Sequence, residues 1–347
     1  MAAGRGGAGV AAAAVGLAAC SSPTPSGSSS GPAITVTTRN MYFGADLSPL
    51  FHATGSQLGP DATAAYQQLQ QSDVPARLQA DAEEIVSARP DLVALQEAVV
   101  WTVTPTGQTS SEVYDFVAGQ RTDLTRLGSP YAVAASSDGF SGALPVPGVG
   151  LVGLQDRDVI LVRDHDARLS VSHPTSGTYQ HVLTVHVAGI LITVKRGRAA
   201  VDATAGKRRF RVIATHLEAY SNPIRDAQAQ AQELLGLVHK SAEPTLVLGD
   251  VNSAATGAGS GTYDAVRKAG LGDAWAAADP GVSGFTCCRA ANLRSGSLTQ
   301  RIDMIFTRGA FHVDRAWLVG AAGSDRTAAG LWPSDHAGVV ATLVPPA

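Results

Sequence analysis

Short apolar segments separated by polar turns run along the chain from residue 33 to its end. Most are rich in Val, Ile and Thr, which is typical of β-strands. The pattern predicts strands at 33–39, 92–95, 131–135, 158–162, 183–187, 190–195, 210–215, 245–248, 304–307, 312–319 and 339–344. Strands outnumber helices and several connect as hairpins, which favours two packed sheets with helices outside over a doubly wound parallel sheet.

Helical spacing of apolar residues is less frequent. Residues 74–88 repeat apolar side chains at helical intervals, and Pro90 follows them as a stop signal. The pattern predicts helices at 74–88, 112–127, 223–239 and 262–269. Residues 139–153 are rich in Gly and Pro and are predicted to form a loop. Their G-x-G-x-x-G spacing lacks the preceding strand that a dinucleotide site requires.

The N-terminus differs in composition from the rest of the chain. Residues 1–19 carry one charge and an apolar run too short to span a bilayer, as in an export signal. The run ends in Leu-Ala-Ala-Cys, which resembles a bacterial lipobox and implies a diacylglyceryl group on Cys20. The alternative is a secretory signal with an incidental cysteine. Residues 20–32 are mostly Ser, Pro and Gly and are predicted to form a flexible tether before a single domain at 33–347.

Composition limits the classes of function. The 347 residues are 45% hydrophobic and 16% charged, as expected of a globular protein with a large core. The net charge is −3, so no basic excess indicates nucleic acid. The three cysteines form no C-x-x-C pair, which argues against a thiolate zinc site. Cys287 and Cys288 are expected near Asp303, either as a disulfide or as buried thiols, with no part in metal binding or chemistry.

Polar residues recur at the ends of the predicted strands. They are Asn40, Glu97, His216, Asp250, Asn252, Asp303, Asp335 and His336. Singly, each has an ordinary explanation, such as a turn residue, a helix cap or a solvated acid. Asp303 is harder to explain this way, because a carboxylate within an apolar strand is costly unless it is paired. If the strands share one core, all of these side chains converge at one rim.

The order of these residues resembles the endonuclease/exonuclease/phosphatase superfamily. The matching stretches are TRN (38–40), LQEA (95–98), THLEA (215–219), LGDVNS (248–253), RIDMIF (301–306) and SDHAGV (334–339). The resemblance extends from about Ile34 to Leu343. It implies an α+β fold, an α/β sandwich with four α/β/β/α layers, and a site at one edge of two packed mixed sheets. It also implies hydrolysis of phosphodiester or phosphomonoester bonds.

The resemblance also implies roles for individual residues. Glu97 would be the main ligand of Mg²⁺, or of Mn²⁺, with Asn40 beside it and Asp335 helping to hold the metal or its water. The other roles are His336 as general base, Asp303 as its hydrogen-bond partner, Asp250 positioning the water, Asn252 holding a phosphate oxygen, and His216 donating to the phosphate or the leaving group. An Asp–His pair and a hard cation suit this chemistry.

Two departures from the family pattern affect the expected site. Some members carry a second acid just after the first-strand Asn, whereas Met41 and Tyr42 follow Asn40 here, which weakens any two-metal scheme. The acidic partner of His216 in the deoxyribonuclease branch is expected within residues 103–153, where several residues compete. Substrate specificity is expected in the loops at 42–73, 103–153 and 253–261.

Two other classes of protein are alternatives to this interpretation. A calcineurin-like metallophosphatase also has a G-D motif, but its early D-x-H and its G-N-H are absent from this sequence. A non-catalytic surface lipoprotein could use the same fold as a binding module, but that predicts loss of catalytic positions. The expectation is therefore a monomeric hydrolase, exported and lipid-anchored at a bacterial membrane surface. Its substrate would be DNA, a phospholipid headgroup or a small phosphate ester.

Overall fold

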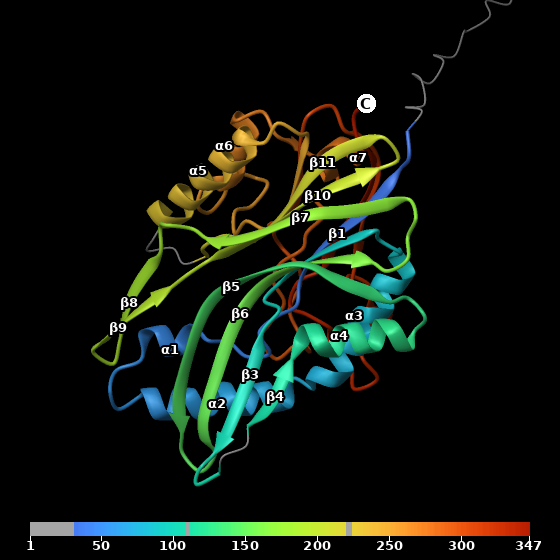
Figure 1. The fold of residues 1–347 in the computed structure, drawn as a ribbon. Coiled ribbons are helices and arrows are strands. Elements are labelled where there is room, and N and C mark those ends of the chain that lie inside the picture. The colour runs from blue at the N-terminus through green and yellow to red at the C-terminus, as the bar shows by residue number, and fades with distance from the viewer. Residues whose placement is uncertain (1–30, 109–110, 220–223) are drawn as a thin grey trace, which may run out of the picture. The chain divides into compact units, whose positions relative to one another are not determined.

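The computed structural model describes residues 31–108, 111–219 and 224–347. Two mixed sheets dominate this part of the chain (Figure 1). The first sheet has the order β15-β16-β1-β2-β6-β3-β4, with β5 paired to β6. Its strands are β15 His312–Val319, β16 Gly338–Val344, β1 Ile34–Asn40, β2 Leu92–Gln96, β6 Gly150–Arg163, β3 Val100–Pro105, β4 Glu112–Asp115 and β5 Tyr131–Val146.

The second sheet has the order β13-β14-β12-β11-β10-β7. Its strands are β13 Gly272–Asp273, β14 Asp303–Arg308, β12 Thr245–Asp250, β11 Arg208–His216, β10 Gly197–Ala205 and β7 Leu169–Thr178. A separate hairpin consists of β8 Leu183–Val187 and β9 Ile190–Val194. Each large sheet contains one parallel pair, β1 with β2 and β11 with β12, among antiparallel neighbours.

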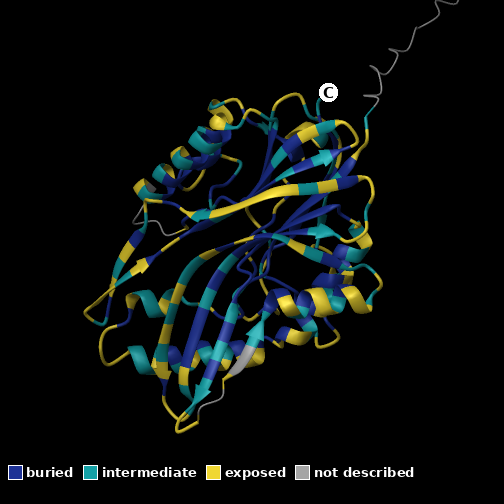
Figure 2. Ribbon diagram, viewed as in Figure 1, coloured by how far each residue is buried: buried dark blue, intermediate teal, exposed yellow. Residues whose placement is uncertain are grey.

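Helices cover the outer face of each sheet, and their exposed sides face away from it (Figure 2). The helices are α1 Ser48–His52, α2 Leu58–Gln71, α3 Val74–Ala88, α4 Phe116–Arg126, α5 Ile224–Lys240, α6 Thr262–Lys268 and α7 Ala274–Ala278, with a short 3₁₀ turn at Gly323–Asp325. One apolar cluster joins α2, α3 and α4 to the first sheet, and another joins α5 and α6 to the second. The predicted four-layer α/β/β/α sandwich is therefore confirmed.

Alternation along the strands explains why the two sheets pack together. In β2, Leu92 and Ala94 enter the core between the sheets, whereas Val93 and Leu95 face the helices. Successive side chains of a strand point to opposite faces, so a strand that is apolar throughout must be covered on both sides. Burying each such side chain contributes about 1.5–3 kcal/mol to stability.

The loop predicted at 139–153 is wrong. Residues 131–146 and 150–163 form the long antiparallel pair β5–β6, joined by a tight turn, with register shifts at 133–135 and 138–141. Gly148 has φ +76° at this turn, a backbone conformation that glycine adopts without steric cost. Pro145 is tolerated because, among the described strands, β5 pairs with β6 alone and its other edge is unpaired.

Other local predictions also need correction. The helix predicted at 112–127 begins only at Phe116, because residues 112–115 form β4, and the side chain of Asp115 caps α4 by accepting from the Ala118 N–H. The segment 42–73, predicted as a loop, contains α1 and α2. Strands β3, β7 and β10 had no counterpart in the prediction. β7 and β10 have weak patterns of their own and are stabilised by packing on the sheets, whereas β3 alternates buried Trp101 and Val103 with Thr and was overlooked.

The predicted signal at 1–19 and Cys20, and the tether through Ser30, lie outside the described residues. Within 31–108, 111–219 and 224–347, no helix is both long and apolar enough to cross a bilayer.

Candidate active site

The predicted site residues lie at one edge of the paired sheets. Asn40 ends β1 and Glu97 directly follows β2, its parallel neighbour. His216 ends β11 and Asp250 ends the parallel strand β12, while Asp303 begins antiparallel β14 opposite Asp250. Since parallel strands end on the same edge of a sheet, chain direction brings these side chains together.

His336 and Asp303 form a buried pair. The ring Nδ1 lies 2.8 Å from Asp303 Oδ2, and it lies 3.8 Å from Asp250 Oδ2. Burial alone would lower the pKa of His336, but the charges of Asp303, Asp335 and Asp250 overcome it and raise that pKa well above 6.5. Asp303 therefore holds the proton on Nδ1 and leaves Nε2 as the nitrogen that can accept one.

Asn40 links the two sheets at this edge. Its Nδ2 donates to Glu97 Oε1 at 3.0 Å and to Asp250 Oδ2 at 3.2 Å, while its Oδ1 accepts from the backbone N–H of Tyr42. Asp250 Oδ1 accepts from the N–H of Asn252. Burial, together with the charge of Asp303, raises the pKa of Asp250 to about 7. Asn40 thus orients two carboxylates that would otherwise repel each other.

Glu97 has an unusual backbone conformation, with φ +51°. Non-glycine residues in this region cost about 1–3 kcal/mol and cluster at functional sites. Its Oε2 accepts from the Phe43 N–H at 2.8 Å. Burial and the nearby charge of Asp335 raise the pKa of Glu97 to about 8. The carboxylates of Glu97 and Asp335 line a polar pocket of about 350 Å³, and Asp156 and Arg196 line the same pocket.

His216 lies between a cation and an amide. Its Nδ1 is 3.3 Å from Arg196 Nη1, and its Nε2 is 3.0 Å from Asn252 Nδ2 and 3.7 Å from Asp250 Oδ2. Burial and the charge of Arg196 lower the pKa of His216 well below 6.5, so the ring is neutral. A guanidinium and an amide N–H both donate hydrogen bonds, so each ring nitrogen faces a donor, and the neutral ring can accept from only one of the two.

The acidic partner of His216 that we expected within 103–153 does not lie beside this ring among the described residues. Its neighbour is Arg196 instead, which pairs with Glu218 at 3.1 Å and approaches Asp156 at 3.9 Å. Sequence reasoning overlooked Arg196 and Asp156. Asp156 and Asp158 occupy alternate positions of β6, next to the apolar run 159–162. This signal could have identified them, because two buried acids on one face of a strand require a partner.

Two groups of side chains in the described chain bring three possible metal-ligand atoms within 4.8 Å of one another. One is Asp250, Asp303 and His336, whose members already hydrogen-bond or pair with each other. The other is Cys287, Cys288 and His336, but the two cysteines are joined as a disulfide. The carboxylates of Glu97 and Asp335 suit a hard cation better, since both line the polar pocket and the charge of Asp335 raises the pKa of Glu97, a repulsion that a cation between them would offset.

The disulfide lies next to the His336 ring. The Sγ of Cys288 is 3.8 Å from His336 Nε2, and Cys287 is buried beside Ile302. Both cysteines therefore lie near Asp303, as expected, and the structure has the paired form rather than the free thiols.

Comparison with known proteins identifies the family. The sequence profile described as the endonuclease/exonuclease/phosphatase family matches residues 67–336. The chain belongs to this family. No curated protein matches its sequence.

Solved structures of the family share the fold at low sequence identity. A family protein from Bacteroides thetaiotaomicron has a TM-score of 0.57 at 18% identity, over 91% of this chain and 99% of that one. A humanized D. rerio TDP2 has a TM-score of 0.55 at 14% identity, over 90% and 98% of the two chains. A mannosyl-6-phosphatase from B. thetaiotaomicron has a TM-score of 0.53 at 18% identity, over 90% and 99%. This likeness shows the fold over about nine-tenths of the chain and leaves its substrate open.

Proposed function

We propose that this protein is a divalent-metal-dependent hydrolase of phosphoester bonds. The observation that carries the proposal is the buried Asp303–His336 pair, 2.8 Å apart, beside Asp250 at the edge where the sheet ends meet. Membership of the endonuclease/exonuclease/phosphatase family supports the same reaction class.

In the proposed reaction, His336 Nε2 accepts a proton from water as the water oxygen forms a bond to phosphorus. The bond between phosphorus and the leaving oxygen breaks, and its electron pair remains on that oxygen. Asp303 stabilises the imidazolium that forms on His336 and keeps the ring in one orientation. Asp250 lies within 3.8 Å of the same ring and orients the water. No covalent enzyme intermediate is required.

The phosphate would lie between these groups and His216. A neutral His216 ring has one N–H that can donate to a phosphate oxygen or to the leaving oxygen, and the Asn252 amide beside it can donate as well. Arg196 lies 3.3 Å from Nδ1 and favours the neutral ring. Glu97 and Asp335 would hold the metal, with Asn40 orienting Glu97. Such an ion, when bound, neutralises charge on the phosphoryl oxygens.

The pH dependence of turnover tests the proposal. With bis-p-nitrophenyl phosphate and saturating Mg²⁺, kcat/KM is expected to rise with pH as His336 loses its proton, with the midpoint above 6.5 because nearby acids raise its pKa. Asp303→Asn removes the closest of these charges, so the midpoint should move to lower pH while the plateau falls.

Asp314→Asn is a matched control, because Asp314 lies 3.3 Å from exposed His312 at the far end of the β15–β16 pair. It should leave the profile unchanged. An unshifted midpoint in Asp303→Asn would contradict the assignment of His336 as the base. Absence of turnover on this diester and on a panel of plasmid DNA, phospholipids and sugar phosphates would favour the binding-module alternative.

We further propose that the protein is exported and anchored by a lipid on Cys20 at a bacterial membrane surface, since Leu-Ala-Ala-Cys follows the apolar run. An anchor of more than one acyl chain gives stable membrane attachment. Cys20→Ala should release the protein to the medium or leave the precursor uncut, whereas the neighbouring Ser21→Ala should not. Fractionation and mass spectrometry of the N-terminal peptide provide the measurement, and an unmodified Cys20 in membrane-bound protein would refute the lipid anchor.

A further inference from the structure

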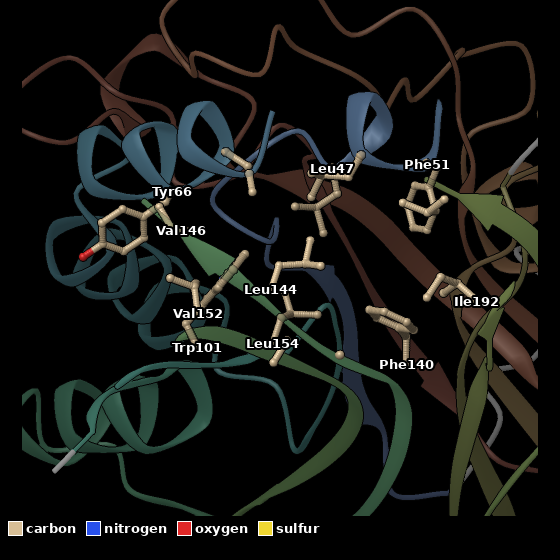
Figure 3. Close-up of a pocket in the computed structure, with 16 residues that line it drawn as sticks. Leu47, Phe51, Tyr66, Trp101, Phe140, Leu144, Val146, Val152, Leu154 and Ile192 are labelled. Carbon is tan, nitrogen blue, oxygen red and sulfur yellow. The ribbon is translucent and has the colours of Figure 1, made fainter. Parts of the chain in front are cut away.

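An apolar pocket lies beside the polar pocket. It has a volume of about 130 Å³, many times what one water requires. Its walls come from α1, α2, β3, β5, β6, β8 and β9, and their side chains converge on the same space (Figure 3). Prominent among them are Leu47, Phe51, Trp101, Phe140, Leu154 and Ile192. The indole N–H of Trp101 donates to the carbonyl of Phe43, so that ring presents carbon to the cavity.

The two pockets share walls. Leu47, Phe51, Phe140 and Leu154 line both of them. A single backbone residue, Phe43, also connects them, because its N–H donates to Glu97 at 2.8 Å and its carbonyl accepts from Trp101 at 2.8 Å. Glu97, which would hold the metal, is therefore linked to Trp101 in the apolar wall through the backbone of Phe43.

The two pockets adjoin because alternate side chains of strands β6 and β9 line first one pocket and then the other. In β6, Leu154 and Asp156 point to the same face, and Asp156 lines the polar pocket. In β9, Ile192 lines the apolar pocket and Val194 lines the polar one. That face of β6 therefore changes from carbon to charge within two residues, about 7 Å along the strand, and the same face of β9 reaches from one pocket to the other.

An apolar cavity of this size is poorly suited to water, because its walls offer few hydrogen-bond partners. Ligand pockets typically combine such walls with a few polar groups that orient the ligand. We propose that the apolar pocket binds an alkyl substituent of the substrate, so that the site selects phosphoesters carrying a hydrophobic group beside the phosphate. The proposal rests on the proposed hydrolase function and names the substrate class of that site.

A series of alkyl p-nitrophenyl phosphates, from methyl through butyl to hexyl, isolates the contribution of the pocket, since the leaving group is constant. With Mg²⁺ present, kcat/KM should rise about fourfold for each methylene that becomes buried and level off when the pocket is filled. Equal rates across the series would overturn the proposal.

Variants then locate the effect. Ala65→Phe places a ring in the pocket from the buried face of α2 and should flatten the series. Ala64→Phe puts the same ring on the exposed face of that helix and should leave the series as in the wild type. Leu144→Gln places a polar group at the half-buried wall on edge strand β5, so it should also flatten the series and covers the case in which Ala65→Phe does not fold. If both variants fold and kcat/KM still rises with chain length as in the wild type, the alkyl group binds elsewhere.

Binding separates failure of the pocket from failure of the proposed function. Methyl-, butyl- and hexylphosphonate cannot be hydrolysed, so calorimetric titration with Mg²⁺ measures affinity without turnover. The dissociation constants should fall along the series in wild type and change little in Ala65→Phe. If no ester is hydrolysed but this trend remains, the hydrolase proposal fails and the pocket assignment stands. If esters are hydrolysed and neither series shows a trend, the pocket assignment alone fails.

Alkyl groups of this kind occur on soluble esters and on membrane lipids. Phosphatidylcholine vesicles, compared with dibutyroyl phosphatidylcholine in solution, distinguish these sources. Faster release of choline from vesicles, with the acyl chains kept on the phosphate as the alkyl group is in the nitrophenyl series, would identify a lipid source, and faster release from the short-chain ester would identify a soluble one. Both results support an alkyl-bearing substrate, and both should be sensitive to Ala65→Phe.

Discussion

Replacing His336 with Ala is expected to lower kcat by about 10²–10⁴-fold, the usual contribution of a general base. The ring is buried and lies 2.8 Å from Asp303, so the variant loses both the proton-accepting nitrogen and the group that Asp303 orients. Steady-state kinetics on the best substrate, with melting temperatures to confirm folding, provide the measurement.

Asp303 acts through this ring in the proposed mechanism. Asp303→Asn should therefore reduce kcat to a similar extent, and the double variant should be little worse than either single one, because residues that act as a unit are non-additive. The exposed pair His312 and Asp314, 3.3 Å apart, supplies matched controls, since substituting either should leave kcat unchanged. If kcat of His336→Ala is within a few-fold of the wild-type value, the catalytic assignment is wrong and Asp335 and His336 form only a structural turn.

Removing divalent metal is expected to abolish turnover. EDTA should stop hydrolysis, and Mg²⁺ or Mn²⁺ should restore it, because the proposed reaction requires charge neutralisation on the phosphoryl oxygens. Glu97→Gln keeps the size of the side chain but removes the charge that would hold the ion. It should therefore raise the Mg²⁺ concentration needed for half-maximal activity, and raising Mg²⁺ should partly restore the rate.

Thermal unfolding gives a readout of the metal that does not depend on turnover. A ligand that binds only the native state raises Tm with its concentration, so Mg²⁺ should stabilise the wild type and stabilise Glu97→Gln less. Glu83→Gln, on the exposed face of α3, is the matched control and should respond like the wild type. Full activity in EDTA would refute metal dependence.

Local patterns in the sequence were informative where an element is buried on both faces. Strands such as 92–95 and 245–248 are apolar throughout, and the structure places β2 and β12 in the interior of the two sheets. The pattern failed at β5 and β6, where Gly and Pro suggested a loop between 139 and 153. Glycine and proline weaken a strand's own preference, but pairing along a long hairpin overrides it. The helix α2 was overlooked because only one side of it is apolar and its polar face is rich in Gln.

The sequence by itself determined the order along the chain of most strands and of the polar residues at their ends. That order identified the family and the sandwich fold. It placed Asn40, Glu97, His216, Asp250 and Asp303 at strand boundaries, because a polar residue after an apolar run marks where a strand leaves the core. Only the tertiary structure decided which side chains meet. Arg196 lies beside His216, and an apolar pocket adjoins Glu97, through contacts between segments far apart in sequence. Such contacts depend on strand register and sheet packing, which no local pattern encodes.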